Sequence, residues 1–181
     1  MSIFRSEKLT VMLSEKELQE RNKVLGAEIA GHYADKEEEL VLVGILKGSF
    51  VFMADLCRTI DLPLTTDFIG LSSYGDSTKS SGVVQLTQDL SKSIEGKHVL
   101  IVEDIVDTGL TMRYLLENFE TRNPASLKVC ALLEKPENNV AKIRVDFLGF
   151  TIPDQFVIGY GLDFAEKYRN LPFVGVWEGE S

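Results

Sequence analysis

The sequence predicts an α/β fold in which a central, mostly parallel sheet is flanked by helices. Two observations support this prediction. Apolar runs typical of buried strands alternate along the chain with helical segments, and polar motifs follow several of these strands. We expect one domain over residues 1–181, because a chain of 181 residues with 44% hydrophobic content suits a single core and contains no linker or repeat.

The expected elements follow in order along the chain. The first helix begins at a capping box formed by Ser14 and Glu17, and its apolar stripe runs from Leu18 through Leu25 to Ile29. Residues 40–46 form a continuous apolar run, typical of a strand that is covered on both faces. The later elements are a helix over 49–60, strands over 64–71, 83–87 and 98–102, a helix over about 111–121, a strand from residue 126, and the short apolar runs DFLGF (146–150) and FVIGY (156–160).

Three polar motifs follow the expected strands. LKGS begins at the end of the strand that closes with Leu46, EDIVDTGLT follows Val102, and EKP follows Leu133. In open α/β sheets, ligands bind beyond the carboxyl ends of the strands. The sequence therefore places a candidate ligand site at this edge of the sheet.

Composition and charge exclude several classes of partner. The net charge of −9 disfavours non-specific binding to nucleic acid or to an anionic membrane. The two cysteines are far apart and signal neither a disulfide framework nor a zinc site. The first residues lack the apolar region of a secretory signal, and no apolar run approaches about twenty residues. We expect a cytoplasmic protein with no nucleic-acid or membrane partner.

The segment from Glu103 to Thr111 has the composition of a ribose-phosphate site. Its D-T-G-L-T portion supplies a glycine, hydroxyl groups and the start of a helix, which together suit an anion. Glu103 and Asp104 would repel a phosphate unless they face sugar hydroxyls or a magnesium ion. The alternative is that these acids only cap the helix and face solvent.

The segment VLIVEDIVDTGLT (99–111) resembles the phosphoribosyl-pyrophosphate motif of the type I phosphoribosyltransferases, in which an apolar strand and two acids precede D-T-G-x-T. Four further segments are similar to the bacterial hypoxanthine(-guanine) phosphoribosyltransferases within that family: LKGS (46–49), the pair Ser73-Tyr74, LLEKP (132–136) and FVIGYGLDFAEKYRNLP (156–172). The resemblance covers nearly the whole chain. It implies the type I phosphoribosyltransferase fold, with a small hood formed by the N- and C-terminal segments.

The resemblance also implies a reaction, in which the 5-phosphoribosyl group passes from phosphoribosyl pyrophosphate to N9 of hypoxanthine or guanine, giving IMP or GMP and pyrophosphate. Asp107 is the implied general base at purine N7, and Lys135 would donate to the 6-oxo group. The implied binding residues are Glu103, Asp104, Asp107, Thr108, Gly109, Leu110 and Thr111 for the ribose and its phosphate; Lys47, Gly48 and Arg169 for pyrophosphate; and Lys135, Phe156, Val157 and Asp163 for the purine.

Magnesium is the implied cofactor, with Glu103, Asp104 and Asp163 as its candidate ligands. In many relatives the bond that corresponds to Leu46–Lys47 is cis. The polar segment 72–82 is expected to be a mobile lid that brings Ser73 and Tyr74 over pyrophosphate, although an ordinary surface loop would have the same composition. The resemblance also implies a homodimer or homotetramer.

Two other functions stay open on the sequence. A guanine- or xanthine-preferring transferase would share these motifs, because the backbone groups that read purine position 2 near Val157 and Asp163 cannot be oriented from one sequence. A non-catalytic nucleotide-sensing regulator could keep the same fold. The acidic charge disfavours an RNA-binding regulator, and such a protein would have less reason to keep Asp107, Lys135 and Asp163 together.

Overall fold

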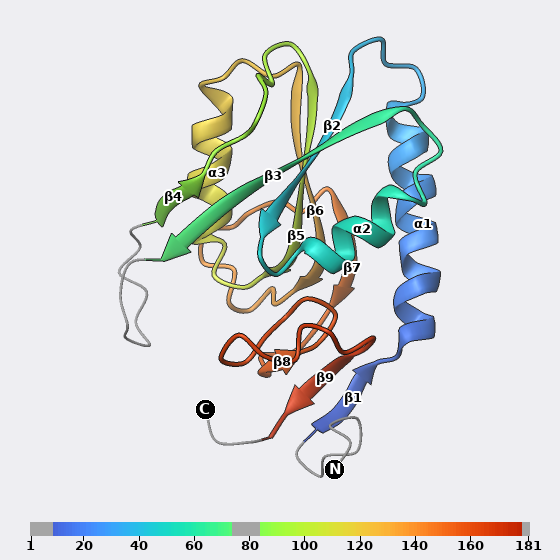
Figure 1. Ribbon diagram of the computed structural model, residues 1–181, viewed down its shortest axis with the longest axis vertical. Coiled ribbons are helices and arrows are strands. Elements are labelled where there is room, and N and C mark those ends of the chain that lie inside the picture. The colour runs from blue at the N-terminus through green and yellow to red at the C-terminus, as the bar shows by residue number, and fades with distance from the viewer. Residues whose placement is uncertain (1–8, 74–83, 179–181) are drawn as a thin grey trace.

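The computed structural model describes residues 9–73 and 84–178. The main sheet has six strands in the order β4-β3-β2-β5-β6-β7 (Figure 1). Five neighbouring strands pair in parallel, namely β3, β2, β5, β6 and β7, and β4 is antiparallel to β3. These strands span Leu64–Ser73 (β3), Val84–Gln88 (β4), Leu40–Leu46 (β2), His98–Val106 (β5), Ser126–Glu134 (β6) and Phe147–Thr151 (β7). The predicted mostly parallel sheet is confirmed.

Helices cover both faces of this sheet. Helices α1 (Glu15–Tyr33) and α2 (Phe50–Cys57) lie on one face, and α3 (Leu110–Glu120) lies on the other (Figure 1). The alternation of side chains along β2 explains this, because Leu42 packs toward α1 and α2 whereas Val41 and Val43 pack toward α3. The capping box predicted at the start of α1 is present.

A second, three-stranded sheet is the hood that the family resemblance implied. It has the order β1-β9-β8 and consists of β1 (Leu9–Leu13), β8 (Val157–Ile158) and β9 (Val174–Trp177). In Figure 1 it lies beyond the carboxyl ends of the main strands. The sequence did not predict β1 or β9, because both are short and β1 becomes a strand only by pairing with a remote segment, as Leu9 does with Trp177.

The strand β5 is longer than predicted, and this difference matters for the site. It was expected to end at Val102, but its pairing with β6 continues as far as Val106 opposite Glu134. Glu103 and Asp104 are therefore strand residues, and do not belong to the loop that follows. Helix α2 is shorter than expected and ends at Cys57.

A buried hydrogen-bond chain joins the hood to the helices of the main sheet. Asn22 Nδ2 on α1 donates to the Tyr160 hydroxyl at 2.8 Å, and that hydroxyl donates to Asp55 Oδ2 on α2 at 2.6 Å. Tyr160 is only 4% exposed. The segment that follows β8 is thereby anchored to α1 and α2 at one buried side chain.

The variant Tyr160→Phe tests this anchor. Removal of the Tyr160 hydroxyl leaves the buried Asn22 amide and the Asp55 carboxylate without this hydrogen-bond partner. We therefore expect the free energy of unfolding to fall by about 1–3 kcal/mol. Urea denaturation measures the change. Tyr114→Phe on α3 is the matched control and should change stability by less than about 0.5 kcal/mol. Equal stability of the two variants would show that the Tyr160 hydroxyl anchors nothing.

Candidate functional site

A cavity of about 270 Å³ lies at the carboxyl ends of β2, β3 and β5. It brings together residues that are far apart in the sequence, including the acids of β5 and an aspartate and an arginine of the segment after β8. Its lining consists of Ile45, Leu46, Gly48, Leu71, Ser72, Glu103, Asp104, Thr111, Asp163 and Arg169. The predicted edge of the sheet therefore carries a cavity whose charged lining residues were all predicted as site residues.

Close backbone approaches shape the turn after β2. The Leu46–Lys47 peptide bond is cis. A Cβ on Gly48 would overlap the Asp104 carboxylate, and a Cβ on Gly161 would overlap the Gly48 carbonyl oxygen. Gly161 also has φ +105°, which side chains rarely adopt. Three segments thus meet here at distances that only glycine permits.

The two consecutive acids of β5 are half-buried, and their surroundings disfavour their charged forms. Burial, together with the neighbouring Asp104 charge, raises the pKa of the Glu103 carboxyl well above its ordinary value. Burial also raises the pKa of Asp104 to about 6, although the Ile105 N–H donates to it and lowers the pKa. Glu103 Oε2 is buried and has no hydrogen-bond partner among residues 9–73 and 84–178. A cation or hydroxyl groups would relieve this arrangement.

These residues fit magnesium only in part. Carboxylate oxygens suit this ion, and the unpartnered oxygen of Glu103 is a free acceptor. Within residues 9–73 and 84–178, however, no group of three or more His, Cys, Asp or Glu side chains is arranged to hold a metal. This combination fits an ion that keeps most of its water and takes other ligands from a substrate.

The D-T-G-L-T motif forms the turn between β5 and α3. Gly109 is the N-cap of α3, with φ +77°, and the helix begins at Leu110. The backbone N–H groups at this helix start face the turn, as expected of an anion cradle. The alternative prediction that an acid caps this helix is wrong, because the N-cap is Gly109 and the Leu110 N–H donates to the Thr108 hydroxyl at 3.5 Å.

Asp107 lies in a polar cluster beside the cavity. Lys135 Nζ lies 3.2 Å from Asp107 Oδ2 and 3.0 Å from Asp154 Oδ1, and Asn138 Nδ2 donates to Asp107 Oδ1 at 3.0 Å. Lys135 is buried, so its charge needs these carboxylates. The predicted pair Asp107 and Lys135 is therefore in direct contact. Asn138 and Asp154 were missed, because no local pattern shows that they turn toward this pair.

The expected purine-binding residues lie on the hood side of Lys135. Phe156 is 48% exposed, and its ring meets that of Phe164 edge-on at 5.9 Å between centroids. The Phe156 carbonyl accepts a hydrogen bond from the Trp177 N–H, which fixes its backbone to β9. Val157 follows as a buried residue of β8. Phe156 thus offers an open aromatic face.

The two expected pyrophosphate-binding cations are both paired with acids. Arg169 contacts Asp163 Oδ1 at 2.8 Å and Glu166 Oε1 at 3.2 Å. Lys47 Nζ lies 2.6 Å from Glu166 Oε2. Glu166 was not predicted as a site residue, since nothing in the sequence indicates that it faces both cations. Ser73 ends β3, whereas residues 74–82 of the expected lid, including Tyr74, lie outside the described residues.

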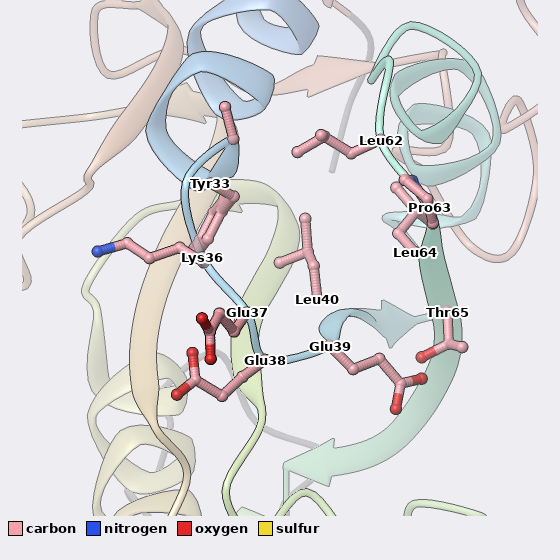
Figure 2. A pocket seen from close by; sticks show the side chains of 11 residues that line it. Tyr33, Lys36, Glu37, Glu38, Glu39, Leu40, Leu62, Pro63, Leu64 and Thr65 are labelled. Carbon is pink, nitrogen blue, oxygen red and sulfur yellow. The ribbon is translucent and has the colours of Figure 1, made fainter.

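A larger pocket, of about 520 Å³, lies at the opposite end of the sheet, where β2 and β3 begin (Figure 2). Figure 2 shows the amine of Lys36 pointing away from it. Two of its acids are already paired, Glu38 with His98 at 3.0 Å and Glu39 with Lys97 at 2.8 Å. None of the polar motifs reaches this pocket, so the smaller cavity is the candidate site.

No helix in the described part of the chain is long and apolar enough to cross a bilayer.

The raised pKa of Asp104 predicts how stability depends on pH. Its value of about 6 in the folded state exceeds the ordinary 3.8, so the folded protein holds this proton more tightly than the unfolded chain does. That contribution is complete below pH 3.8 and is lost as the pH rises through 6. Asp104→Asn should therefore stabilise the metal-free protein more at pH 7.5 than at pH 4.5, by about 2–3 kcal/mol.

Denaturation at the two pH values in the presence of EDTA measures this difference. The matched control is Asp89→Asn, because Arg122 lowers the pKa of Asp89 and the effect of that variant should have the opposite sign. An Asp104→Asn protein whose stability follows the wild type at both pH values would contradict the strained state of Asp104.

Comparison with known proteins agrees with this geometry. The family model described as "Phosphoribosyl transferase domain" matches residues 15–165. A hypoxanthine-guanine phosphoribosyltransferase of Bacillus subtilis is 51% identical over 166 residues, which cover 92% of this chain and 91% of the relative. A hypoxanthine phosphoribosyltransferase of Escherichia coli is 46% identical over 165 residues, covering 91% and 93% of the two chains.

Solved structures of similar proteins have the same fold. The crystal structure of a hypoxanthine phosphoribosyltransferase from Staphylococcus aureus has a TM-score of 0.91 at 45% identity, covering 97% of this chain and 95% of the other. The Trypanosoma cruzi hypoxanthine phosphoribosyltransferase in complex with the product IMP has a TM-score of 0.90 at 44% identity, covering 96% of each chain. This chain therefore belongs to the phosphoribosyltransferase family and has the type I phosphoribosyltransferase fold.

Proposed function

We propose that this protein is a purine salvage enzyme that transfers the 5-phosphoribosyl group from phosphoribosyl pyrophosphate to N9 of hypoxanthine, and also of guanine. The observation that carries the proposal is the position of Asp107. It directly follows β5, whose acids Glu103 and Asp104 line the cavity that suits a sugar phosphate, and it contacts Lys135, whose ammonium suits an oxopurine. Relatives at about half identity that are named for this activity support the assignment.

The reaction gathers positive charge on the sugar ring as the bond to pyrophosphate breaks. Glu103 and Asp104 are consecutive, half-buried residues of β5 that line the cavity, where fixed negative charge would stabilise a developing cation. Sugar hydroxyls or a cation near these acids would also satisfy the unpartnered Glu103 oxygen. In this proposal the residues from Thr108 to Thr111 hold the 5′-phosphate at the start of α3.

Magnesium is the proposed cofactor, held by Glu103, Asp104 and Asp163. When it is bound, it offsets the charge of the pyrophosphate oxygens and orients them. The acids alone do not form a complete metal cage, so the proposal needs a substrate that brings further oxygen ligands. Lys47, Gly48 and Arg169 are the proposed contacts of pyrophosphate, and Ser73 and Tyr74 the proposed lid contacts.

The purine site in this proposal depends on the contact between Asp107 and Lys135. Asp107 accepts the proton of purine N7 as N9 attacks the sugar. The Lys135 ammonium has three N–H donors, two of which face Asp107 and Asp154, and the third serves a 6-oxo group. A 6-amino group offers that donor no acceptor, so adenine is disfavoured. Hypoxanthine, guanine and xanthine all carry the 6-oxo group, so their ranking depends on contacts at purine position 2.

The same proposal includes a cytoplasmic location and assembly into a homodimer or homotetramer. A nucleotide-sensing regulator is the second candidate function. The contact between Asp107 and Lys135 disfavours it, because a sensor has no use for a base aimed at the purine side of the cavity.

A panel of purines tests the proposed reaction. With phosphoribosyl pyrophosphate and magnesium, we expect nucleotide to form from hypoxanthine and guanine and not from adenine, followed by the absorbance change of the purine. Asp107→Asn should lower kcat by about 10²–10⁴-fold, since it removes the base, while phosphoribosyl pyrophosphate still binds. Asp89→Asn is the control away from the site. Nucleotide binding without product from any purine would favour the sensor instead.

The close approach at Gly48 gives a second test. Gly48→Ala places a methyl group against the Asp104 carboxylate, so the turn and the acid must move apart. We expect kcat/KM for phosphoribosyl pyrophosphate to fall by about 100-fold, because small displacements of aligned groups are costly. Gly31→Ala on α1 is the matched control, since no atom lies within 4 Å of its added Cβ. Wild-type activity in Gly48→Ala would mean that this contact does not position Asp104.

A further inference from the structure

One carboxylate, that of Glu166, contacts both cations assigned to pyrophosphate. Lys47 Nζ lies 2.6 Å from Oε2, and an Arg169 guanidinium nitrogen lies 3.2 Å from Oε1. Each oxygen thus accepts from a different cation, as two oxygens of a bound pyrophosphate could. We propose that Glu166 competes with pyrophosphate for Lys47 and Arg169, and thereby limits how tightly the site holds this product. The inference rests on the function proposed above.

A tight hairpin aims Glu166 at these cations. The backbones of Phe164 and Lys167 exchange two hydrogen bonds, of 3.1 and 3.0 Å, across a two-residue turn. The two turn residues, Ala165 and Glu166, have φ of +50° and +63°, a conformation that hairpin turns of this length favour but that usually selects Asn and Gly. Strain of this kind in non-glycine residues collects at functional sites. The two hydrogen bonds across the turn therefore hold Ala165 and Glu166 in a strained conformation.

The backbone of Glu166 is fixed by the same site. Its N–H donates to Asp163 Oδ2 at 2.8 Å, and the other oxygen of Asp163 contacts Arg169. Asp163, Glu166 and Arg169 therefore form one connected group. Removing the charge of Glu166 would therefore change the electrostatic environment of Asp163 and Arg169, which line the cavity.

Glu166 matters most at Lys47. Arg169 is mostly buried and keeps two other partners, Asp163 and the Gly161 carbonyl oxygen, which accepts from it at 2.8 Å. Lys47 is 66% exposed, and Glu166 is its only ion-pair partner among the described residues. The Lys47 ammonium is also the main cause that holds the pKa of Glu166 below its ordinary value. A pyrophosphate that binds Lys47 must therefore displace this carboxylate or share the ammonium with it against the repulsion of its like charge.

The competition is weak enough to be reversible. Ion pairs between exposed side chains contribute little and are screened by salt. A multiply charged pyrophosphate can therefore displace Glu166, which then stays nearby as a like charge. The expected effect of removing the Glu166 charge is about a two- to fivefold gain in pyrophosphate affinity.

Glu166→Gln tests the proposal through a gain that misfolding cannot produce. Titration calorimetry with magnesium pyrophosphate at low ionic strength should show tighter binding by Glu166→Gln than by the wild type, and the gain should shrink at about 0.5 M salt. The KM for hypoxanthine should not change. The matched control is Glu28→Gln, which removes an exposed, ion-paired glutamate of α1 and so changes net charge equally.

A second pair of variants locates the effect. In the Lys47→Met background, Glu166→Gln should give a smaller gain than in the wild type, because the main competed cation is gone. Unchanged or weaker pyrophosphate binding by Glu166→Gln overturns the proposal, as does an equal gain in Glu28→Gln. If the wild type forms nucleotide and binds pyrophosphate but Glu166→Gln gains nothing, only this inference fails. If the wild type does neither, the proposed function fails with it.

Discussion

The position of Glu103 and Asp104 on β5, half-buried at the edge of the cavity, is the constraint on which the site depends. Because β5 stays paired with β6 as far as Val106, both acids are held by a rigid strand at the edge of the core. Loss of solvent contact raises the pKa of each, and one buried Glu103 oxygen has no hydrogen-bond partner among the described residues. The folded chain thus carries an electrostatic cost at this position that a bound sugar or cation relieves. The two acids thus lower the stability of the ligand-free protein at the position where a ligand is expected to bind.

The surrounding structure keeps these acids in a narrow space. Gly48 lies against Asp104, and Gly161 lies against the Gly48 carbonyl, so two turns meet the strand without intervening side chains. The turn at Gly161 belongs to the segment anchored by the buried Tyr160 hydroxyl, which contacts α1 and α2. The segment after β8 is therefore in direct contact with α1, α2 and the turn that borders the cavity. A displacement of the hood segment would move Arg169 and Asp163 together.

Each lysine of the site contacts at least one carboxylate. Lys135 lies between Asp107 and Asp154, and Glu166 lies between Lys47 and Arg169. The buried Lys135 is held in place by its two acids before a substrate arrives, so part of the cost of ordering it is met before binding. We infer that the exposed Glu166 instead opposes the pyrophosphate that would use Lys47 and Arg169.

Most of the fold and the charged residues that line the cavity could be predicted from sequence, because their signals are local. The buried strands show as apolar runs, the first helix shows as a capping box, and the proposed phosphate site is a contiguous motif from Asp107 to Thr111. Strands β1 and β9 could not be predicted, since both are short and β1 forms only by pairing with β9 at the other end of the chain.

The sequence by itself determined the α/β class, the sheet edge that carries the site and the chemical types gathered there. Only the tertiary structure decided which of these groups touch. It placed Glu103 and Asp104 inside a strand, where burial changes their proton affinity, and it brought Asn138, Asp154 and Glu166 to the site. The physical reason is that burial and ion pairing depend on distances between segments remote in the chain, which no local pattern of residues encodes.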